Sequence, residues 1–443
     1  MGSEKKSARM FENVLFVKIF RTFRIAIHPG KLMIAFSTVA IICLSGWIMD
    51  FSQTVVTTPS IQGQQSELQV YISAPDQVPA YLETHEENEQ RTGVFSALWN
   101  FGTARFHRAL NCLFTFDLPA VAANIADCFK ALVWALRYHF FYSIIFFAIN
   151  LAVIAIAGGA ICRMTALQFA QGQKPALTTS VRFSIKRFTS FFTAPLAPVV
   201  IIIILGLFIF LLGLVGNIPW LGELIMTVCM VLALIVGALI AVLSIGAVAG
   251  FGLMFPAVAY DGSDCFDAIS RSLNYVYSRP WRMGFYTATA AVYGAICYIF
   301  VRLFAFLLLW FTHRFLQFGV MVDSSSRQVN KLIAIWPQPS FTDLIGPSGS
   351  IPTNWSESIA AFVTYLFLLA VVGLVVSFVI SFYFSANTII YSLMRNKVDD
   401  TAIEDIYTDT SDVETADTED SCDNSKSQSK SKTDDEQPPD DNV

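Results

Sequence analysis

Charged residues are scarce in this chain, and their scarcity excludes a soluble globular protein. Only 14% of the 443 residues are Asp, Glu, Lys or Arg, whereas soluble domains carry about 25%. Hydrophobic residues make up 54% of the chain, and the mean hydropathy is +0.55. The composition therefore predicts an all-α fold, a polytopic membrane helix bundle with the lipid bilayer as its solvent.

Motifs of common catalytic and metal sites are also missing. The sequence has no G-x-x-x-x-G-K, H-E-x-x-H or G-x-S-x-G pattern, and its five histidines are isolated. The eight cysteines form no C-x-x-C pair. Only Cys112 and Cys128 share a segment in which a disulfide is possible, and the sequence leaves open whether they pair. We therefore expect no catalytic site, no metal or other cofactor, and no nucleic-acid partner.

Six apolar runs are long enough to cross a bilayer, which takes about 20 residues. They are Leu32 to Met49, Tyr138 to Cys162, roughly Ala194 to Val215, the run that begins at Leu224, Met283 to about Phe311, and the run from Ser358 to Arg395. The sequence thus predicts about six transmembrane helices over residues 32–395, with long loops at 50–137 and 313–357.

Lys and Arg gather before the first span, after the second, and between the fourth and fifth. With six spans these three flanks fall on one side, which the positive-inside rule assigns to the cytoplasm. We therefore expect a multi-pass protein of the cytoplasmic (inner) membrane. Both termini would be cytoplasmic, and the loops 50–137 and 313–357 would lie outside.

Two amphipathic segments are expected to lie in the membrane interface. In the cytoplasmic N-terminal segment 1–31, Lys18, Arg21 and Arg24 recur every three residues opposite an apolar face. This pattern suits anionic lipid headgroups. Residues 117–136 place Val121, Ile125, Phe129, Leu132 and Leu136 along one face, and we expect this helix to continue directly into the second span.

The C-terminal segment is strongly acidic. Residues 396–443 hold 16 acidic and 4 basic side chains and few apolar ones. This composition predicts a disordered acidic cytoplasmic tail that could hold a basic protein partner.

A polar stretch between the fourth and fifth spans raises the main functional question. Asp261, Asp264 and Asp267 recur every three residues, and Arg271 follows them. They could hold a divalent metal or a polyprenyl phosphate, or they could form the polar elbow between two helices. In the second reading Gly262 ends one helix, Ser263 or Asp264 caps the next, and the acidic groups meet the helix dipole.

An internal echo favours the structural reading. When Gly172 is aligned with Gly262, Ser180 aligns with Ser270, and in each copy a span is followed by a glycine and an amphipathic helix. The first copy has no acidic residue, although a shared metal or phosphate chemistry would require one.

Two polar residues lie inside predicted spans. Arg302 is expected near the outer boundary, where a snorkelling side chain is more common than a buried anion site. Asn150 suits an interhelical hydrogen bond as well as it suits a substrate contact. The small residues Gly246 and Gly250 indicate close helix packing, either inside the bundle or at a dimer seam.

Several strings carry a resemblance. They are "GGAICRMTALQFAQGQKPALTTSVRFSIKRF", "APLAP", "PAVAYDGSDCFDAISRSLNYVYSRPW" and "SANTIIYSLMRNKVD". Over most of residues 11–400 the chain resembles an uncharacterised six-span membrane protein family of planctomycete-type bacteria. It is distantly similar to the membrane domain attached to some glycerophosphodiester phosphodiesterases. No phosphodiesterase domain is present, so the resemblance implies the membrane fold and transfers no catalytic residue.

Two functions follow from this reading. The chain is expected to be a membrane scaffold or assembly factor that organises lipid or protein partners. The alternative is a permease-like transporter or transporter subunit. Transporters usually carry ionisable groups or broken helices near the midplane, and Asn150 stands nearly alone there, so the sequence favours the scaffold.

Overall fold

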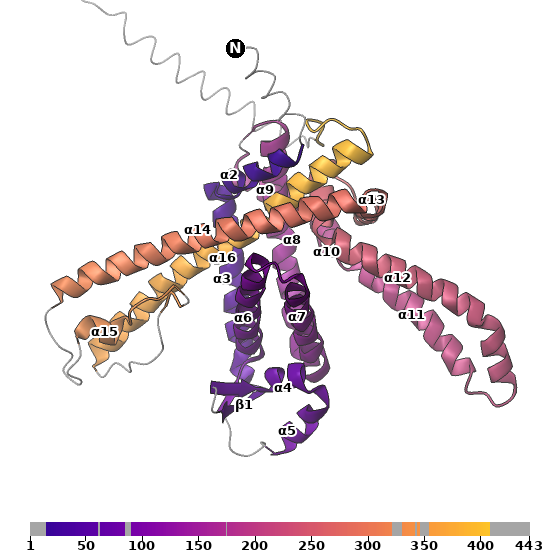
Figure 1. Cartoon of the computed structure of the whole chain (residues 1–443), viewed down its shortest axis with the longest axis horizontal. Helices are drawn as coiled ribbons and strands as arrows, with labels where there is room; N and C mark the ends of the chain where they lie inside the picture. Colours follow the sequence, from indigo (N-terminus) through magenta and orange to yellow (C-terminus); the bar gives the residue numbers. More distant parts are fainter. Residues whose placement is uncertain are drawn as a thin grey trace, which may run out of the picture. The chain divides into compact units, whose positions relative to one another are not determined.

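A computed structural model of the chain describes residues 15–60, 63–84, 90–173, 175–320, 330–341, 343–345 and 354–407. Within these residues, seven helices are long and apolar enough to cross a membrane (Figure 1). They are α3 (Pro29–Met49), α7 (Leu118–Tyr138), α8 (Phe140–Ala170), α11 (Ala197–Val215), α12 (Leu221–Asp261), α14 (Pro280–Gly319) and α16 (Trp355–Val398). The expected all-α polytopic fold is confirmed.

The chain divides into two compact units, which are described separately. Unit 1 comprises residues 1–157 and 284–386, and unit 2 comprises residues 158–283 and 387–443. The long helices α8 and α16 contribute to both units, and α14 lies almost wholly in unit 1.

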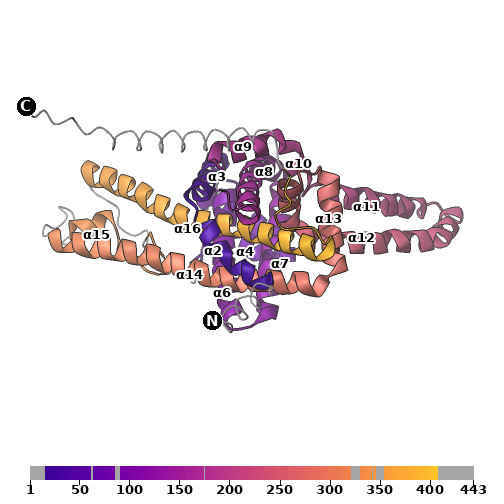
Figure 2. The same cartoon turned by 90° about the horizontal axis from the view of Figure 1, so that it is seen from above.

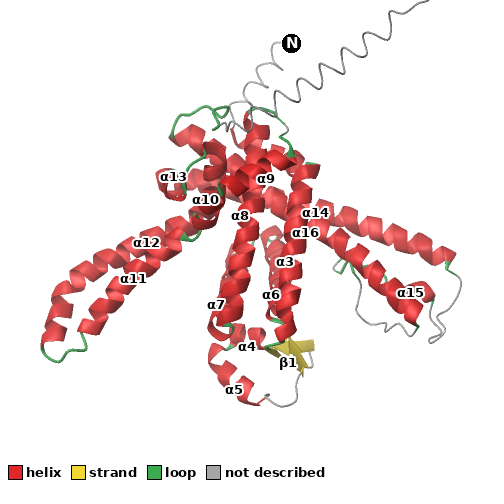
Figure 3. Ribbon diagram, turned by 180° about the vertical axis from the view of Figure 1, so that it is seen from behind, coloured by secondary structure: helices red, strands yellow, loops and turns green. Residues whose placement is uncertain are grey.

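Unit 1 contains a small folded layer within the segment 50–137 that the sequence indicated only as a loop. Strands β1 (Val55–Ser60), β2 (Gly63–Ser66) and β3 (Gln90–Thr92) form an antiparallel sheet in the order β2-β1-β3, drawn in yellow in Figure 3. The helices α4 (Glu67–Ser73) and α5 (Val78–Thr84) follow β2 and are joined by the 3-10 helix η3 (Pro75–Gln77). A second 3-10 helix, η2 (Asp50–Ser52), lies between α3 and β1. Val55, Leu68, Val78 and Trp134 form the core of this layer.

The helix α6 (Val94–Phe114) packs antiparallel against α7. Asp50 holds the start of α6, since its carboxylate accepts hydrogen bonds from the backbone N–H of Phe95 and of Ser96, both at 2.9 Å. The Tyr142 hydroxyl donates to the same carboxylate at 3.0 Å. One carboxylate at the end of α3 therefore ties α6 and α8 to that helix.

The structure corrects the expectation for the segment that precedes the second span. His139 separates α7 from α8, so the two helices are not continuous, and α7 is itself a candidate span. The predicted apolar face, which includes Ile125 and Phe129, is exposed, while Ala131 and Trp134 are buried. The apolar stripe thus faces outward, where lipid would lie, and the face with Ala131 and Trp134 packs against the protein.

The N-terminal segment forms η1 (Leu15–Arg21) and α2 (Thr22–Ala26). It packs on α14 and α16 within unit 1, because Phe23 meets Phe300 and Phe378 edge to face. Ser381 also donates to the Ala26 carbonyl at 2.7 Å. Its apolar side is therefore covered in part by protein rather than by lipid alone. In the same unit, α15 (Lys331–Ile335) precedes α16.

Unit 2 contains an apolar helical hairpin. Figures 1 and 2 show α11 and α12 side by side, joined by a short turn. The second half of α12 packs against α13 (Cys265–Ser278), and α9 (Leu177–Lys186) and α10 (Phe188–Thr193) complete the unit. Gly246 and Gly250 face α13, where an added Cβ would meet Leu273 and Ser272. Of the two alternatives left open for these glycines, the structure shows packing within the chain.

The glycine elbows expected from the internal echo are present. Gly172 follows α8 with φ +72°, and Gly262 follows α12 with φ +61°, a left-handed conformation that favours glycine. A third long helix ends in the same way, since Asp400 follows α16 with φ +51°. All three elbows belong to unit 2.

Residues 399–407, which we call the C-terminal strap, are folded onto unit 2, although the sequence assigned them to a disordered tail. The rest of that predicted tail, residues 408–443, lies outside the described residues.

Candidate functional site

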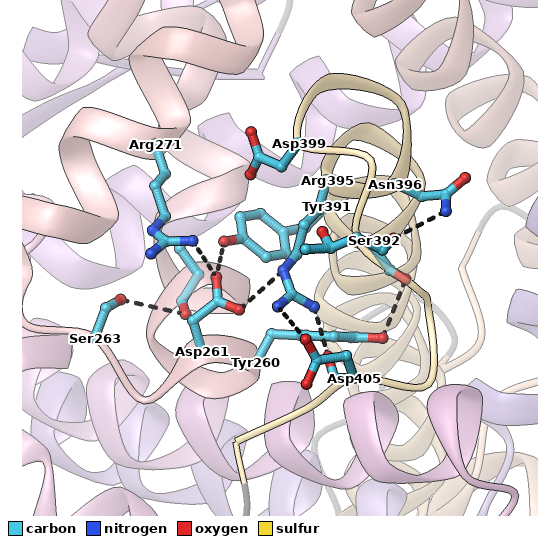
Figure 4. Close-up of polar contacts among 12 residues, drawn as sticks. Tyr260, Asp261, Ser263, Arg271, Tyr391, Ser392, Arg395, Asn396, Asp399 and Asp405 are labelled. Atoms are coloured by element: carbon cyan, nitrogen blue, oxygen red, sulfur yellow. Dashed lines mark hydrogen bonds and ion pairs between the residues drawn. The ribbon is translucent and has the colours of Figure 1, made fainter.

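Asp261, the last residue of α12, is the centre of a polar cluster in unit 2 (Figure 4). Its carboxylate pairs with Arg395 Nε at 3.1 Å and with Arg271 Nη1 at 3.3 Å, and only 7% of the side chain is exposed. The Tyr391 hydroxyl also donates to it. The buried carboxylate is thus neutralised by two guanidinium groups.

Helix geometry explains how these groups converge. Tyr391 and Arg395 are four residues apart on α16, so they share one face. Gly262 turns the chain after Asp261, and α13 then brings Arg271 back to it. Asp267 lies one turn before Arg271 on α13 and accepts from its Nε at 3.0 Å. The cluster therefore joins the ends of three helices, α12, α13 and α16.

The strap covers this cluster. Arg395 Nη1 donates to the Asp405 carbonyl at 2.5 Å, and its Nη2 lies 3.6 Å from the Asp405 carboxylate. The Tyr260 hydroxyl donates to the carbonyl of Ile403, and the Tyr407 N–H donates to the Tyr260 carbonyl at 3.0 Å. Asn396 donates to the Thr401 carbonyl at 2.9 Å (Figure 4). The strap is held mainly by backbone carbonyls, which any sequence could supply.

Two further arginines bind the elbow from the side of α8 and α9. Arg163 is fully buried, donates to the Ala259 carbonyl at 3.0 Å and lies over the ring of Phe183. Arg187 donates to the Gly262 carbonyl. These bonds satisfy two carbonyls at the end of α12, which the helix itself leaves without an internal partner.

The start of the strap has its own anchor. The Tyr275 hydroxyl donates to the Asp399 carboxylate at 2.5 Å. Burial raises the pKa of the Tyr275 phenol, and the neighbouring Asp399 carboxylate raises it further. Tyr275 therefore remains a neutral donor at physiological pH.

The three carboxylates singled out in the sequence do not act together. Asp261 and Asp267 meet through Arg271, but Asp264 takes no part in the cluster. Asp264 occupies the N-cap position of α13, yet its side chain makes no capping hydrogen bond, and the Ser263 hydroxyl donates to the Ala257 carbonyl instead. The expected side-chain cap is therefore wrong, while the glycine break is confirmed.

Arg302 lies in unit 1, and it is buried rather than snorkelling, with 8% of the residue exposed. Its Nε donates to the Phe341 carbonyl at 3.0 Å, and its Nη1 donates to the Tyr298 hydroxyl at 2.7 Å. The same nitrogen contacts His107 Nε2. Burial, and then the nearby Arg302 charge, lower the pKa of His107, which favours the neutral imidazole.

Asn150 also lies in unit 1. Its amide donates to the Phe146 carbonyl of its own helix at 2.7 Å, so the interhelical bond expected from the sequence is not the contact found. Asn150 borders an open cavity of about 370 Å³ whose other lining residues are apolar or aromatic, apart from Cys128. Cys112 and Cys128 are both free thiols, which answers the question of their pairing.

The ion pairs around Asp261 suit a structural role. Among the described residues no group of three or more His, Cys, Asp or Glu side chains is placed to hold a metal ion. Buried carboxylates that pair with guanidinium groups fix geometry, and removal of one partner leaves a costly buried charge. The arrangement around Asp261 is thus suited to holding three helix ends and the strap together.

Sequence reasoning missed Tyr391, Arg395, Arg187 and the strap. One signal was available for Arg395, because the predicted six-span threading ends the fourth and sixth spans on the same side. Asp261 and Arg395 are the first charged residues after those two spans. The threading therefore predicts that both lie at the same surface of the membrane.

No protein-family model, no curated protein and no solved structure matches this chain.

Proposed function

We propose that this protein is a membrane scaffold that organises lipid or protein partners, and that it has no catalytic activity of its own. The proposal includes insertion in the cytoplasmic membrane with both termini in the cytoplasm. Membership in the six-span family that the sequence resembles also remains part of the proposal.

The observation that supports it most directly is the hairpin of α11 and α12. In unit 2 these helices pack on each other, and their outer faces carry long rows of exposed apolar side chains, such as Ile203, Val231 and Ile235. The described part of α11 has no polar side chain at all. A hairpin of this kind offers two apolar faces to lipid and to the helices of other membrane proteins, but no polar path for a solute.

The polar cluster gives the second support. Its ion pairs connect α12, the second helix of the hairpin, to α13, α16 and the strap. A scaffold must keep a fixed shape while partners bind, and buried ion pairs tied into three helix ends resist relative movement of those ends. The permease-like alternative would rely on the cavity beside Asn150, whose apolar lining suits a hydrocarbon group better than a polar solute.

Site-specific photo-crosslinking in native membranes tests the proposal. A photoreactive residue at Ile203 or Ile235 is expected to give adducts of defined mass with one membrane protein. The same residue at Met254, which is buried in unit 2, should give none and serves as the control. Adducts with lipid alone at both exposed positions, together with solute flux in reconstituted vesicles, would favour the permease.

A further inference from the structure

Two arginines of unit 2 flank the link between Asp261 and Gly262. Arg395 pairs with the Asp261 carboxylate at 3.1 Å, and Arg187 donates to the carbonyl of Gly262. Because their partners are consecutive residues, the two guanidinium groups bind the same short piece of backbone.

The strap contacts both guanidinium groups. Asp405 binds the Nη atoms of Arg395 with its carbonyl and its carboxylate. Two residues later the ring of Tyr407 lies against the Arg187 guanidinium, with 5.0 Å between the ring centre and Cζ. The same ring fills the space over Gly262, where an added Cβ would lie 2.7 Å from it. One acidic segment thus covers two cations at once.

The strap residues that cover the arginines are themselves exposed. The Asp405 side chain is 67% exposed, and Tyr407 is also open to solvent. An exposed carboxylate contributes little net binding, because water and salt compete for it. Another anion with more oxygen atoms can therefore displace the Asp405 carboxylate from Nη2 of Arg395 at low cost, whereas release of the Asp405 carbonyl from Nη1 requires the strap to move.

Phosphate has the chemistry that this position favours. A guanidinium presents parallel N–H donors that match two phosphate oxygens, and such charge-assisted pairs are stronger than neutral hydrogen bonds. Arg182 and Lys186, which precede Arg187 on α9, are exposed and add positive charge to this helix. A phosphate that took the place of Asp405 would meet the in-plane Nη donors of Arg395, and the positive charge of Arg187, which binds the next residue of the same backbone, would add to the attraction.

We propose that Arg187 and Arg395 form a binding site for a phosphate group, and that the strap occupies this site as an internal competitor. The ligand is a phosphate group carried by an anionic lipid or present as free phosphate. The inference is independent of the scaffold proposal, because it concerns a ligand site and its control rather than a partner of the hairpin.

The test compares full-length variants in a neutral detergent. Asp405→Asn combined with Tyr407→Ala loosens the strap and leaves every arginine in place. Phosphatidylglycerol is titrated and counted on the protein by native mass spectrometry, with phosphatidylcholine as the uncharged reference. If the strap leaves the site open about a tenth of the time, its release raises the affinity for phosphatidylglycerol about tenfold. Glu404→Gln removes the same charge from an exposed strap residue and should leave the affinity unchanged.

When Arg187→Gln is added to the variant with the loosened strap, the increase in affinity for phosphatidylglycerol should disappear. Lys186→Gln, at the exposed neighbouring residue, should leave that increase unchanged. Inorganic phosphate forms the second arm. Competition by millimolar phosphate identifies free phosphate as a ligand, and binding of the lipid without such competition identifies the lipid headgroup. Equal affinity in the wild type and the loosened variant overturns the proposal, as does a gain that survives Arg187→Gln.

Discussion

The ring of Tyr407 lies against the guanidinium group of Arg187, with 5.0 Å between the ring centre and Cζ. This contact joins the last described residue of the chain to the link between α9 and α10. The strap is therefore part of the folded protein, and the position at which the chain is cut determines the effect of a truncation.

A chain that ends after Tyr407 keeps every strap contact described above, and we expect its unfolding temperature to match that of the full-length protein. A chain that ends after Asp400 loses the bonds made by Ile403, Asp405 and Tyr407. This loss should reduce stability by about 3 kcal/mol, since three hydrogen bonds are lost and each contributes about 1 kcal/mol net. Thermal unfolding of both truncations in detergent measures the difference, and equal unfolding temperatures would contradict a folded strap.

Asp261→Asn should be strongly destabilising, because it leaves the guanidinium of Arg395 without its buried charged partner, and the exposed Asp405 carboxylate replaces it poorly. Removal of one member of a buried ion pair costs about 3–5 kcal/mol. Asp267→Asn is the matched control, since Asp267 is 44% exposed and pairs with Arg271 on its own helix. It should cost no more than about 0.5 kcal/mol. Chemical unfolding of the two variants gives both values, and similar losses would argue against Asp261 as the centre of the cluster.

Helix capping offers a second pair of variants. Asp264→Ala should change stability very little, because the Asp264 side chain makes no capping hydrogen bond. Asp117→Ala removes a side chain that accepts from the Ala120 N–H at 3.1 Å at the start of α7, and it should cost about 1 kcal/mol. The comparison uses the same unfolding measurement. A larger effect at Asp264 than at Asp117 would show that the observed cap geometry is wrong.

Acidification should destabilise unit 1 through His107. The pKa of His107 is lowered in the folded protein by burial and by the Arg302 charge. The unfolded chain, with a histidine pKa of about 6.5, therefore binds a proton more readily than the folded chain. Stability contributed by the neutral imidazole is complete above that value and decreases as the pH falls below it. Unfolding temperatures between pH 8 and pH 5 should show a decrease that is smaller in His107→Gln.

Reporter fusions decide whether α7 crosses the membrane. With six spans, a fusion after Gln65 lies outside and fusions after Gln171 and Gly262 lie in the cytoplasm. If α7 also crosses, the later two positions move to the outer side. We expect the six-span pattern, because the basic flanks then coincide on one side. Enzymatic reporters active on only one side of the membrane give the result for each position, and a cytoplasmic signal after Gln65 would reject the threading.

Most of the long helices can be predicted from the sequence, because a helix that crosses the bilayer needs about 20 apolar residues. Each of the six apolar runs corresponds to a long helix, and the runs indicated their positions well. The helices extend beyond the predicted spans, as α12 begins at Leu221 and α16 continues to Val398. A hydropathy pattern indicates only the apolar part of a helix. Helical turns beyond that part carry polar residues, so hydropathy does not predict them.

The small sheet and the strap were missed for different reasons. The strands β1 and β3 are short and separated by two helices, so no alternating pattern was long enough to indicate them. The strap is acidic, and composition alone predicts disorder for such a segment. Its order depends on Arg395 and Tyr260, which lie on other helices, and contacts of that kind cannot be read from local composition.

The continuity of α12 has a consequence for how the chain can vary in length. One unbroken helix carries Gly246 and Gly250, which receive α13, and ends at Asp261, which pairs with Arg395. An inserted residue between Gly250 and Asp261 would rotate the carboxylate by about 100° around the helix axis, away from both arginines. An insertion in the turn at 216–220 would leave this register intact. Alignment gaps among relatives should therefore fall in that turn and spare the interval from Gly246 to Asp261.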